Sequence, residues 1–349
     1  MNKITLYFFS GTGNSRSVAK WFADEAMKND NDIEIKNVAD VKHTKIVTED
    51  REILGFISPT HGFNYPPIMI SFLLGLPRAR NNAAFVMNTR AGLKLGKVFI
   101  PGLSGIALLL AALILLIKGY KVVGMRPVDL PSNWISIHPG LNKPTIGKLF
   151  EKRKNEVIKF AQKITNGKKD YRAFWDIIQD LLIAPISLGY YFIGRFIFAK
   201  SFYASSKCNN CKACIEQCPV GAIKMIDNRP FWKHSCESCM QCMNNCPHKA
   251  IETAHGYLIG MMYLINSVIL FYLYLLLDIK LYISSLPEFL HKFTSDVLNA
   301  VIFLTLLFLS YRIFHYLLRF SFFEKIVLYT SLTKLPFWSR YRAPKKFSK

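Results

Sequence analysis

All eight cysteines of this 349-residue chain lie between residues 208 and 246, and they constrain the fold of that stretch more than any other feature of the sequence. They form two copies of one motif, "CNNCKACIEQCP" and "CESCMQCMNNCP", and each copy reads C-x2-C-x2-C-x3-C-P. The second copy starts 28 residues after the first, and the likeness continues into the Ala-Ile pairs at 222–223 and 250–251. The repeat predicts an internal duplication with two-fold pseudosymmetry.

The spacing of the cysteines predicts two [4Fe-4S] clusters with crossed ligands. Three thiolates of a C-x2-C-x2-C run can surround one corner of a cubane cluster, and the fourth cysteine, which a proline follows, can reach the other cluster. The ligands expected for the first cluster are Cys208, Cys211, Cys214 and Cys246. The ligands expected for the second cluster are Cys236, Cys239, Cys242 and Cys218.

Two other uses of these cysteines agree less well with the pattern. Disulfides within C-x2-C-x2-C runs would be strained, and zinc does not need a third and fourth cysteine at these offsets. His234 and His248 lie beside the expected ligands, and with a full set of cysteines we expect them to be surface residues or hydrogen-bond donors to a cluster. Residues 205–252 resemble the bacterial two-cluster ferredoxins, which implies a small α+β domain.

Residues 4–15, "ITLYFFSGTGNS", predict a buried strand followed by a phosphate-binding loop, and "RSVAKWFA" after it has the apolar spacing of a helix. Gly11 and Gly13 allow a ligand to approach the backbone. The polar residues that can donate hydrogen bonds to an anion at the helix N-terminus are Ser10, Thr12, Asn14 and Ser15. The loop lacks the lysine of a nucleoside triphosphate loop and the G-x-G-x-x-G spacing of a dinucleotide fold. A Gly-Ser turn without a ligand is the alternative.

Two further buried strands end in polar, glycine-containing loops, "ILGFISPTHGFNYPP" (53–67) and "AAFVMNTRAG" (83–92). Because loops at the carboxyl ends of adjacent parallel strands meet at one crevice, we expect all three loops to form a single site. The candidate residues of the second loop are Pro59, Thr60, His61, Gly62, Phe63, Asn64 and Tyr65. Those of the third loop are Asn88, Thr89, Arg90, Ala91 and Gly92.

Residues 1 to about 165 resemble the flavodoxin family, because "SGTGNS" matches its T/S-x-T-G-x-T/S signature. The resemblance implies an α/β doubly wound parallel sheet of strand order 2-1-3-4-5. It also implies FMN, with its phosphate on residues 10–15 and its isoalloxazine ring between loops 59–65 and 88–92. Phe63 or Tyr65 would stack on one face of the flavin. The third loop has no aromatic residue, so the other face is expected to be open or covered by a partner domain.

The charge distribution favours a membrane surface over nucleic acid as a partner. The formal net charge is +22, and 51% of the residues are hydrophobic. Ten basic residues face three acidic ones between 143 and 172, and nine face one from residue 312 onward. Both runs flank apolar stretches, which is typical of contact with anionic lipid. The first run is also the expected solvent face of the last flavodoxin helix. We expect no cleavable signal before the first strand.

Residues 257–277 form an uncharged stretch of 21 residues, long enough to cross a bilayer, and 297–318 form a second expected span. The connector between them carries few basic residues and the tail carries many, so the positive-inside rule predicts a cytoplasmic tail and cytoplasmic N-terminal domains. A buried pair of core helices is the alternative. The expected result is a transmembrane helical hairpin.

Two other apolar stretches are expected not to span. Residues 105–117 lie between two strands that should pair in parallel, so we predict a crossover helix whose outer face rests on lipid or on the anchor. Residues 181–198 separate the flavin and cluster regions. Electron transfer needs those regions close together, so this stretch is expected to be interfacial or re-entrant, with Trp175 and Tyr190 as anchors.

The expected organisation follows from these parts. A flavodoxin-like domain (1–166) and an apolar, basic linker (167–204) precede a ferredoxin-like domain (205–255), two transmembrane helices (256–318) and a basic tail (319–349). The first two domains together resemble flavodoxin/ferredoxin fusions.

We therefore expect a membrane-anchored oxidoreductase that passes electrons between a soluble low-potential donor or acceptor protein, two clusters, FMN and a lipophilic or small-molecule acceptor. A non-catalytic carrier and a cluster-dependent sensor are the alternatives. The sequence shows no nicotinamide site, and His61 and Arg90 are expected to be positioning residues rather than catalytic ones.

Overall fold

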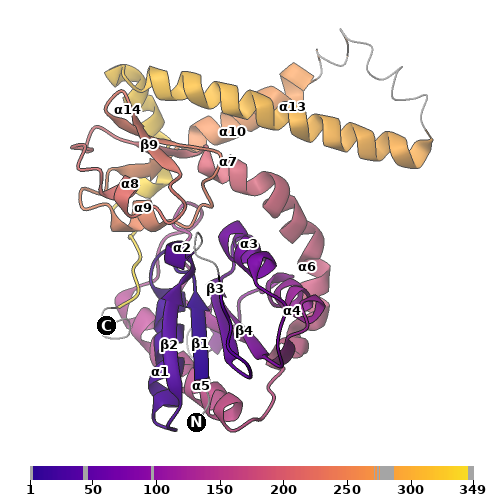
Figure 1. The fold of residues 1–349 in the computed structure, drawn as a ribbon. Helices are drawn as coiled ribbons and strands as arrows, with labels where there is room; N and C mark the ends of the chain where they lie inside the picture. The colour runs from indigo at the N-terminus through magenta and orange to yellow at the C-terminus, as the bar shows by residue number, and fades with distance from the viewer. Residues whose placement is uncertain are drawn as a thin grey trace.

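The computed structural model describes residues 3–41, 46–95, 98–270, 272, 275 and 287–344, which form an α/β domain, a small cysteine-rich domain and a set of long helices (Figure 1). The α/β domain is built on a parallel sheet of five strands in the order β2-β1-β3-β4-β7. The strands are β1 (Lys3–Phe8), β2 (Asp32–Asn37), β3 (Ile53–Pro59), β4 (Ala83–Ala91) and β7 (Lys121–Leu130). This is the predicted flavodoxin-like order.

Helices cover both faces of the sheet, and each face has its own apolar core. On one face lie α1 (Asn14–Met27) and α5 (Lys143–Thr165), whose aromatic residues Trp21 and Phe150 meet edge to face. On the other lie α3 (Pro67–Gly75) and α4 (Ala107–Ile117). The short helix α2 (Val38–Val41) and a hairpin of β5 (Leu93–Leu95) and β6 (Val98–Ile100) complete the domain.

Helix α4 is the predicted crossover helix, because it connects the parallel neighbours β4 and β7. One side of α4 is buried against the sheet. Its outer side is apolar as well, and Leu113, Leu116 and Ile117 are all more than half exposed.

The linker forms one helical segment that runs along the α/β domain to the cysteine-rich domain (Figure 1). It consists of η1 (Arg172–Asp176), α6 (Ile177–Gly189), η2 (Tyr190–Gly194) and α7 (Arg195–Ala199). Ser187 donates a hydrogen bond to the carbonyl of Phe63 (2.9 Å), and Asp180 accepts one from the amide of Gly105 (2.8 Å). The segment therefore lies against the α/β domain instead of leading away from it.

The cysteine-rich domain shows the two-fold pseudosymmetry that the repeat predicts. Strand β8 (Phe202–Ala204) pairs with β11 (Ile251–Thr253), and β9 (Ile223–Ile226) pairs with β10 (Arg229–Trp232). A short helix contains the third cysteine of each repeat, Cys214 in α8 (Ala213–Glu216) and Cys242 in α9 (Gln241–Asn245). Each begins after a residue in the left-handed conformation, Lys212 with φ 59° and Met240 with φ 61°.

The C-terminal region contains α10 (His255–Tyr263), η3 (Leu264–Ile269), α13 (Glu288–Leu317), α14 (Ser321–Tyr329) and η4 (Leu332–Lys334). By length and composition, the helices that could cross a membrane within the described residues are 172–199 and 292–317. The expected span 257–277 is helical as far as residue 270 and lies in part outside the described residues. The second expected span, 297–318, lies within α13 except for its last residue, and α13 starts nine residues before it.

The residues after η4 return to the α/β domain. Trp338 and Tyr341 are buried, and the indole of Trp338 donates a hydrogen bond to the carbonyl of Ile135. The tail therefore packs between the two domains.

Candidate redox site

The three predicted loops meet at the carboxyl edge of the sheet. The amide of Thr60 donates to the carbonyl of Thr89 (2.9 Å), and the hydroxyls of Ser15 and Thr89 lie 3.1 Å apart. These bonds join the ends of β1, β3 and β4 around a cavity of about 560 Å³. That volume is in the usual range for a small-molecule or cofactor site.

Most of the residues predicted for the flavin site line this cavity. They are Ser10, Gly11, Thr12, Asn14, Ser15, Pro59, Thr60, Gly62, Phe63, Thr89, Arg90 and Ala91.

Six predicted residues lie elsewhere. Gly13 faces the tail, where an added Cβ would lie 2.8 Å from the Cβ of Ala343. Tyr65 is buried in the core, and its hydroxyl donates to the carbonyl of Met87 (2.7 Å), so Phe63 is the aromatic residue of this loop that reaches the cavity.

The other four residues outside the cavity have structural surroundings of their own. His61 and Asn64 exchange backbone hydrogen bonds that close the second loop. Asn88 is buried within β4, and Gly92 packs so closely against Asp129 that an added Cβ would lie 2.7 Å from its side chain.

The phosphate loop has the backbone that anion binding requires. Gly13 adopts φ 103° and starts α1, and among the described residues no side chain caps this helix. The first amides of a helix lack acceptors within it, and the helix dipole favours an anion there. The hydroxyl of Ser10 accepts a hydrogen bond from the amide of Gly13 (3.0 Å), which closes the loop. The uncapped helix and the adjoining cavity fit the phosphate and the ring of FMN.

Sequence reasoning missed an aromatic wall of the cavity. Trp134 comes from the loop after β7, and Tyr190 and Phe198 come from the linker segment. The ring centroid of Trp134 lies 5.3 Å from that of Tyr190 and 5.4 Å from that of Phe198. Trp134 follows a strand end, so the rule that predicted the other loops also applies to it. The linker residues could not be placed by that rule.

Gly62 allows this wall to approach the second loop. It has φ +54°, and an added Cβ would lie 2.0 Å from the Cγ of Tyr190. The linker therefore lines the cavity beside the second loop, through Tyr190 and Phe198.

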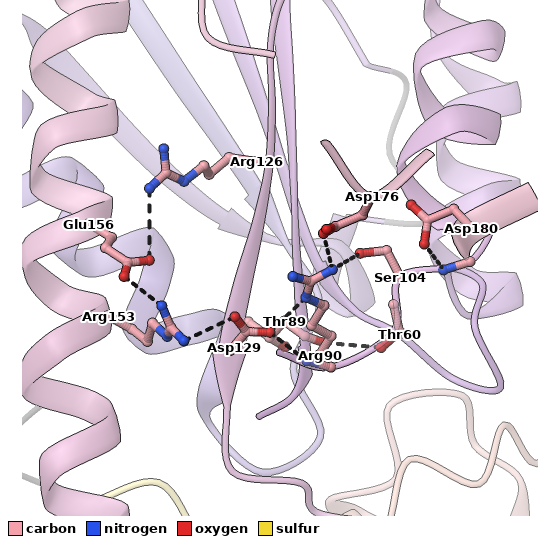
Figure 2. A network of polar contacts seen from close by, with 12 residues as sticks. Thr60, Thr89, Arg90, Ser104, Arg126, Asp129, Arg153, Glu156, Asp176 and Asp180 are labelled. Atoms are coloured by element: carbon pink, nitrogen blue, oxygen red, sulfur yellow. Dashed lines mark hydrogen bonds and ion pairs between the residues drawn. The ribbon is translucent and has the colours of Figure 1, made fainter. Parts of the chain in front are cut away.

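Arg90 is the centre of a buried polar network at the end of β4 (Figure 2). Its guanidinium donates to Asp129 (2.7 Å), to Ser104 (3.1 Å) and to Asp176 of the linker (2.6 Å). Asp129 also pairs with Arg153 of α5 (3.1 Å). Two carboxylates neutralise Arg90, so its role is to hold the cavity wall and the start of the linker in place.

The structure brings the cysteines together in the two crossed sets. Cys214 interacts electrostatically with Cys208, Cys211 and Cys246, and these four line one small cavity, which Cys242 of the second set also reaches. Cys242 lies within range of Cys236, Cys239 and Cys218. Among the described residues, no three His, Cys, Asp or Glu side chains are close enough to bind a single metal ion.

The two sets differ in exposure. In the first set Cys211 is exposed and its three partners are half-buried. In the second set Cys236 is buried, burial raises the pKa of its thiol to about 12, and burial also raises the pKa of Cys239 and Cys242. Free thiols there would stay protonated, and cluster formation would replace those protons with iron.

Comparison with protein families gives a match to the 4Fe-4S dicluster domain at residues 207–251. The chain joins a flavodoxin-like domain to a ferredoxin-type dicluster domain. No curated protein matches the sequence.

The solved structures that resemble the chain overlap its flavodoxin-like half. Flavodoxin 1 from Bacillus cereus is 18% identical and the match covers 45% of this chain and 98% of that one, with a TM-score of 0.32. A flavodoxin from the domain Archaea is 20% identical, with coverage of 46% and 98% and a TM-score of 0.29. Rubredoxin oxygen:oxidoreductase from Desulfovibrio gigas is 14% identical with a TM-score of 0.31. This match covers 46% of our chain and 36% of that protein's length.

The dicluster domain touches the wall of the flavin cavity. An added Cβ on Gly11 would lie 2.3 Å from the carbonyl oxygen of Cys239, so only glycine allows this approach. Asn133, which lines the cavity, donates a hydrogen bond to the same carbonyl (3.2 Å), and its own carbonyl accepts one from Asn244 (3.2 Å). The second cysteine set and the cavity therefore share a wall.

Proposed function

We propose that this protein transfers electrons between two [4Fe-4S] clusters and FMN at the inner face of a cell membrane, and passes them to a lipophilic or small-molecule acceptor. The observation that supports this most is the contact of Gly11 with the backbone of Cys239. A bound flavin changes redox state by one or two electrons and a cluster by one, so the pair can interconvert these two kinds of chemistry. The loop at 10–15 would hold the phosphate, and Phe63 and Trp134 would flank the ring.

The exposure of the two cysteine sets supports an order of transfer. The first set includes the exposed Cys211, so a soluble low-potential protein would exchange electrons there. The second set adjoins the flavin cavity, because the backbone of Cys239 contacts Gly11. The proposed order is partner, first cluster, second cluster and FMN.

The exposed apolar surface supports a membrane partner. Trp175, Ile178 and Leu182 of the linker segment are each more than 70% exposed, and they recur at helical spacing. Helix α13 extends beyond the dicluster domain (Figure 1), with Phe293, Val297 and other apolar residues exposed. Isolated apolar side chains on a surface are ordinary, but rows of this length are typical of contact with lipid or protein. We assign the linker to the membrane surface and α13 to the anchor.

The proposal is tested by purification without oxygen from membranes. We expect about eight iron and eight acid-labile sulfide per chain, FMN on extraction, and electron paramagnetic resonance signals from two reduced clusters. Zinc without sulfide would contradict the cluster assignment. Rapid mixing with a low-potential donor should then reduce the flavin through the clusters. A flavin that stays oxidised while both clusters are reduced would contradict the proposed path.

The carrier alternative differs from the enzyme in turnover. An enzyme would turn over a quinone analogue or another small acceptor steadily with an artificial donor. A carrier would only exchange electrons with another protein. The aromatic wall of the flavin cavity, formed in part by the linker that we assign to the membrane, favours a lipophilic acceptor.

A further inference from the structure

Lys200 is a buried cation beside the second cysteine set. Lys200 follows α7 directly and is 3% exposed. Its ammonium donates a hydrogen bond to the carbonyl of Trp232 (2.5 Å). A buried ammonium is costly unless it is paired. Within the described part of the chain, no salt bridge joins Lys200 to a carboxylate.

Three aromatic rings surround the ammonium of Lys200. The ring centroids of Phe231, Phe308 and Tyr311 lie 5.1, 5.0 and 4.7 Å from its Nζ atom. Phe231 belongs to β10 of the dicluster domain, whereas Phe308 and Tyr311 belong to α13. Such contacts stabilise a cation, because the face of an aromatic ring is electronegative. The three rings keep water away from the ammonium but carry no negative charge that would neutralise it.

The charged groups that act on Lys200 point to its counter-ion. Lys200 lies beside the second cysteine set, because Trp232, whose carbonyl accepts its hydrogen bond, packs in one cluster with Cys236 and Cys242. Arg312 and Lys224 are cations that oppose its charge, and Cys236 is a neighbouring group that can form an anion. Burial lowers the pKa of Lys200 to about 8, so it remains mostly an ammonium at neutral pH. A cluster held by four thiolates is negative overall and becomes more negative when it is reduced. A nearby cation therefore stabilises the reduced state, because net charge is one of the terms that set cluster potentials.

We propose that Lys200 is the counter-charge of the second cluster and raises its midpoint potential. This inference rests on the proposed function, because it requires the second cysteine set to hold a cluster. Lys200 acts through its charge and does not bind iron. Since two rings of its cage lie on α13, the same residue joins the cluster to the anchor helix.

The test compares Lys200→Met, Lys200→Arg and the distant surface variant Lys168→Met in full-length protein purified without oxygen. Redox titration followed by electron paramagnetic resonance gives the midpoint potential of each cluster. The signals are assigned with Cys211→Ser and Cys239→Ser, which each remove one ligand of one set. We expect Lys200→Met to reduce the equilibrium constant for reduction of the second cluster about tenfold, which is about 59 mV for a one-electron couple. The first cluster serves as the internal reference.

Lys200→Arg should stay close to the wild type, and so should Lys168→Met. An unchanged second-cluster potential in a fully loaded Lys200→Met protein would overturn the counter-charge role while leaving the proposed function intact. If Lys200→Met fails to hold the second cluster, iron analysis of Lys200→Arg decides the matter. Retention of that cluster in Lys200→Arg supports a need for charge, and its loss there overturns the inference. Absence of both clusters from the wild type would instead refute the proposed function.

Discussion

Cys218 belongs to the first cysteine repeat in sequence but lies with the second repeat in space. Replacing Cys218 with Ala should therefore damage the second cluster and leave the signal of the first largely intact. The matched control is Cys246→Ala, which should do the reverse. Electron paramagnetic resonance of the reduced proteins measures both. Loss of the first cluster in Cys218→Ala would show that the ligands are not crossed.

Thr12 lines the cavity within the phosphate loop. A Thr12→Val change replaces a hydroxyl with a methyl group, which leaves a phosphate oxygen without its partner at a cost of about 1–3 kcal/mol. We expect FMN affinity to fall about tenfold or more, measured by flavin content and by titration of the flavin-free protein. Thr165→Val at the end of α5 is the control. Equal flavin binding in both variants would argue against the loop as the phosphate site.

His61 is buried beside the backbone of Glu237, where burial lowers its pKa from 6.5 to about 4. The unfolded chain takes up a proton below pH 6.5, and the folded chain does not until about pH 4. The contribution of neutral His61 to the free energy of unfolding is therefore fully present above pH 6.5. It is lost as the pH falls from 6.5 to about 4. We expect a loss of about 1 kcal/mol between pH 7.5 and pH 5.5, measured by urea unfolding. His61→Gln should reduce this loss, and an equal loss in the variant would remove His61 as the cause.

Single residues of the site were predictable where a local pattern determines them. Cysteine spacing indicated the crossed sets, and the strand-loop-helix pattern indicated Ser10 to Ser15. His61 and Tyr65 were placed in the flavin site by their position in a loop. The sequence could not show that the loop turns them inward, because that depends on packing against residues distant in the chain.

The linker is the element whose role changes most between sequence and structure. Its apolar pattern predicted contact with a membrane, which stays a prediction, and the structure shows a row of exposed apolar residues on it. The pattern did not show that the opposite side closes the flavin cavity through Tyr190 and Phe198. The sheet order and the crossover helix α4 were predictable, because strands separated by a helix must pair in parallel. The hairpin of β5 and β6 has no comparable signal.

Trp175 offers a direct test of the linker's position, because it is 80% exposed on the apolar row. In vesicles that contain brominated lipid, part of the tryptophan fluorescence should be quenched. We expect the Trp175→Phe variant to lose most of that quenching, since the other tryptophans lie within the folded domains. Trp21→Phe, which changes a buried residue of α1, is the control. Equal quenching in both variants would place the row away from lipid.

At the scale of the whole molecule, the chain before α10 and the chain after α13 belong to one folded unit. Residues 335–344 contact the α/β domain, and Glu324 of α14 pairs with Arg229 of the dicluster domain (2.6 Å). A chain that crosses a bilayer must then cross it an even number of times between these parts. Under the proposed topology this side is the cytoplasmic one, because the positive-inside rule favours a cytoplasmic location for the basic tail.

Sidedness can be measured with cysteines introduced into the full chain. Under the proposed topology, a membrane-impermeant reagent added outside the cell should label Ser285→Cys and should miss Ser339→Cys. Opened cells should allow labelling at both positions. Labelling of Ser339→Cys in intact cells, or of neither position, would show that the helices do not form a membrane-crossing hairpin.

Tyr341 donates a hydrogen bond to Asn14 (2.5 Å) across 327 positions of sequence, and the amide of Ala343 donates to the carbonyl of Thr12 (2.9 Å). During synthesis on the ribosome, the phosphate loop is among the first segments to emerge and this support is among the last. The complete loop therefore forms only after the iron-sulfur domain and α13 have been made. Folding therefore has a built-in order, in which a chain whose C-terminal region fails to fold also lacks a complete phosphate loop.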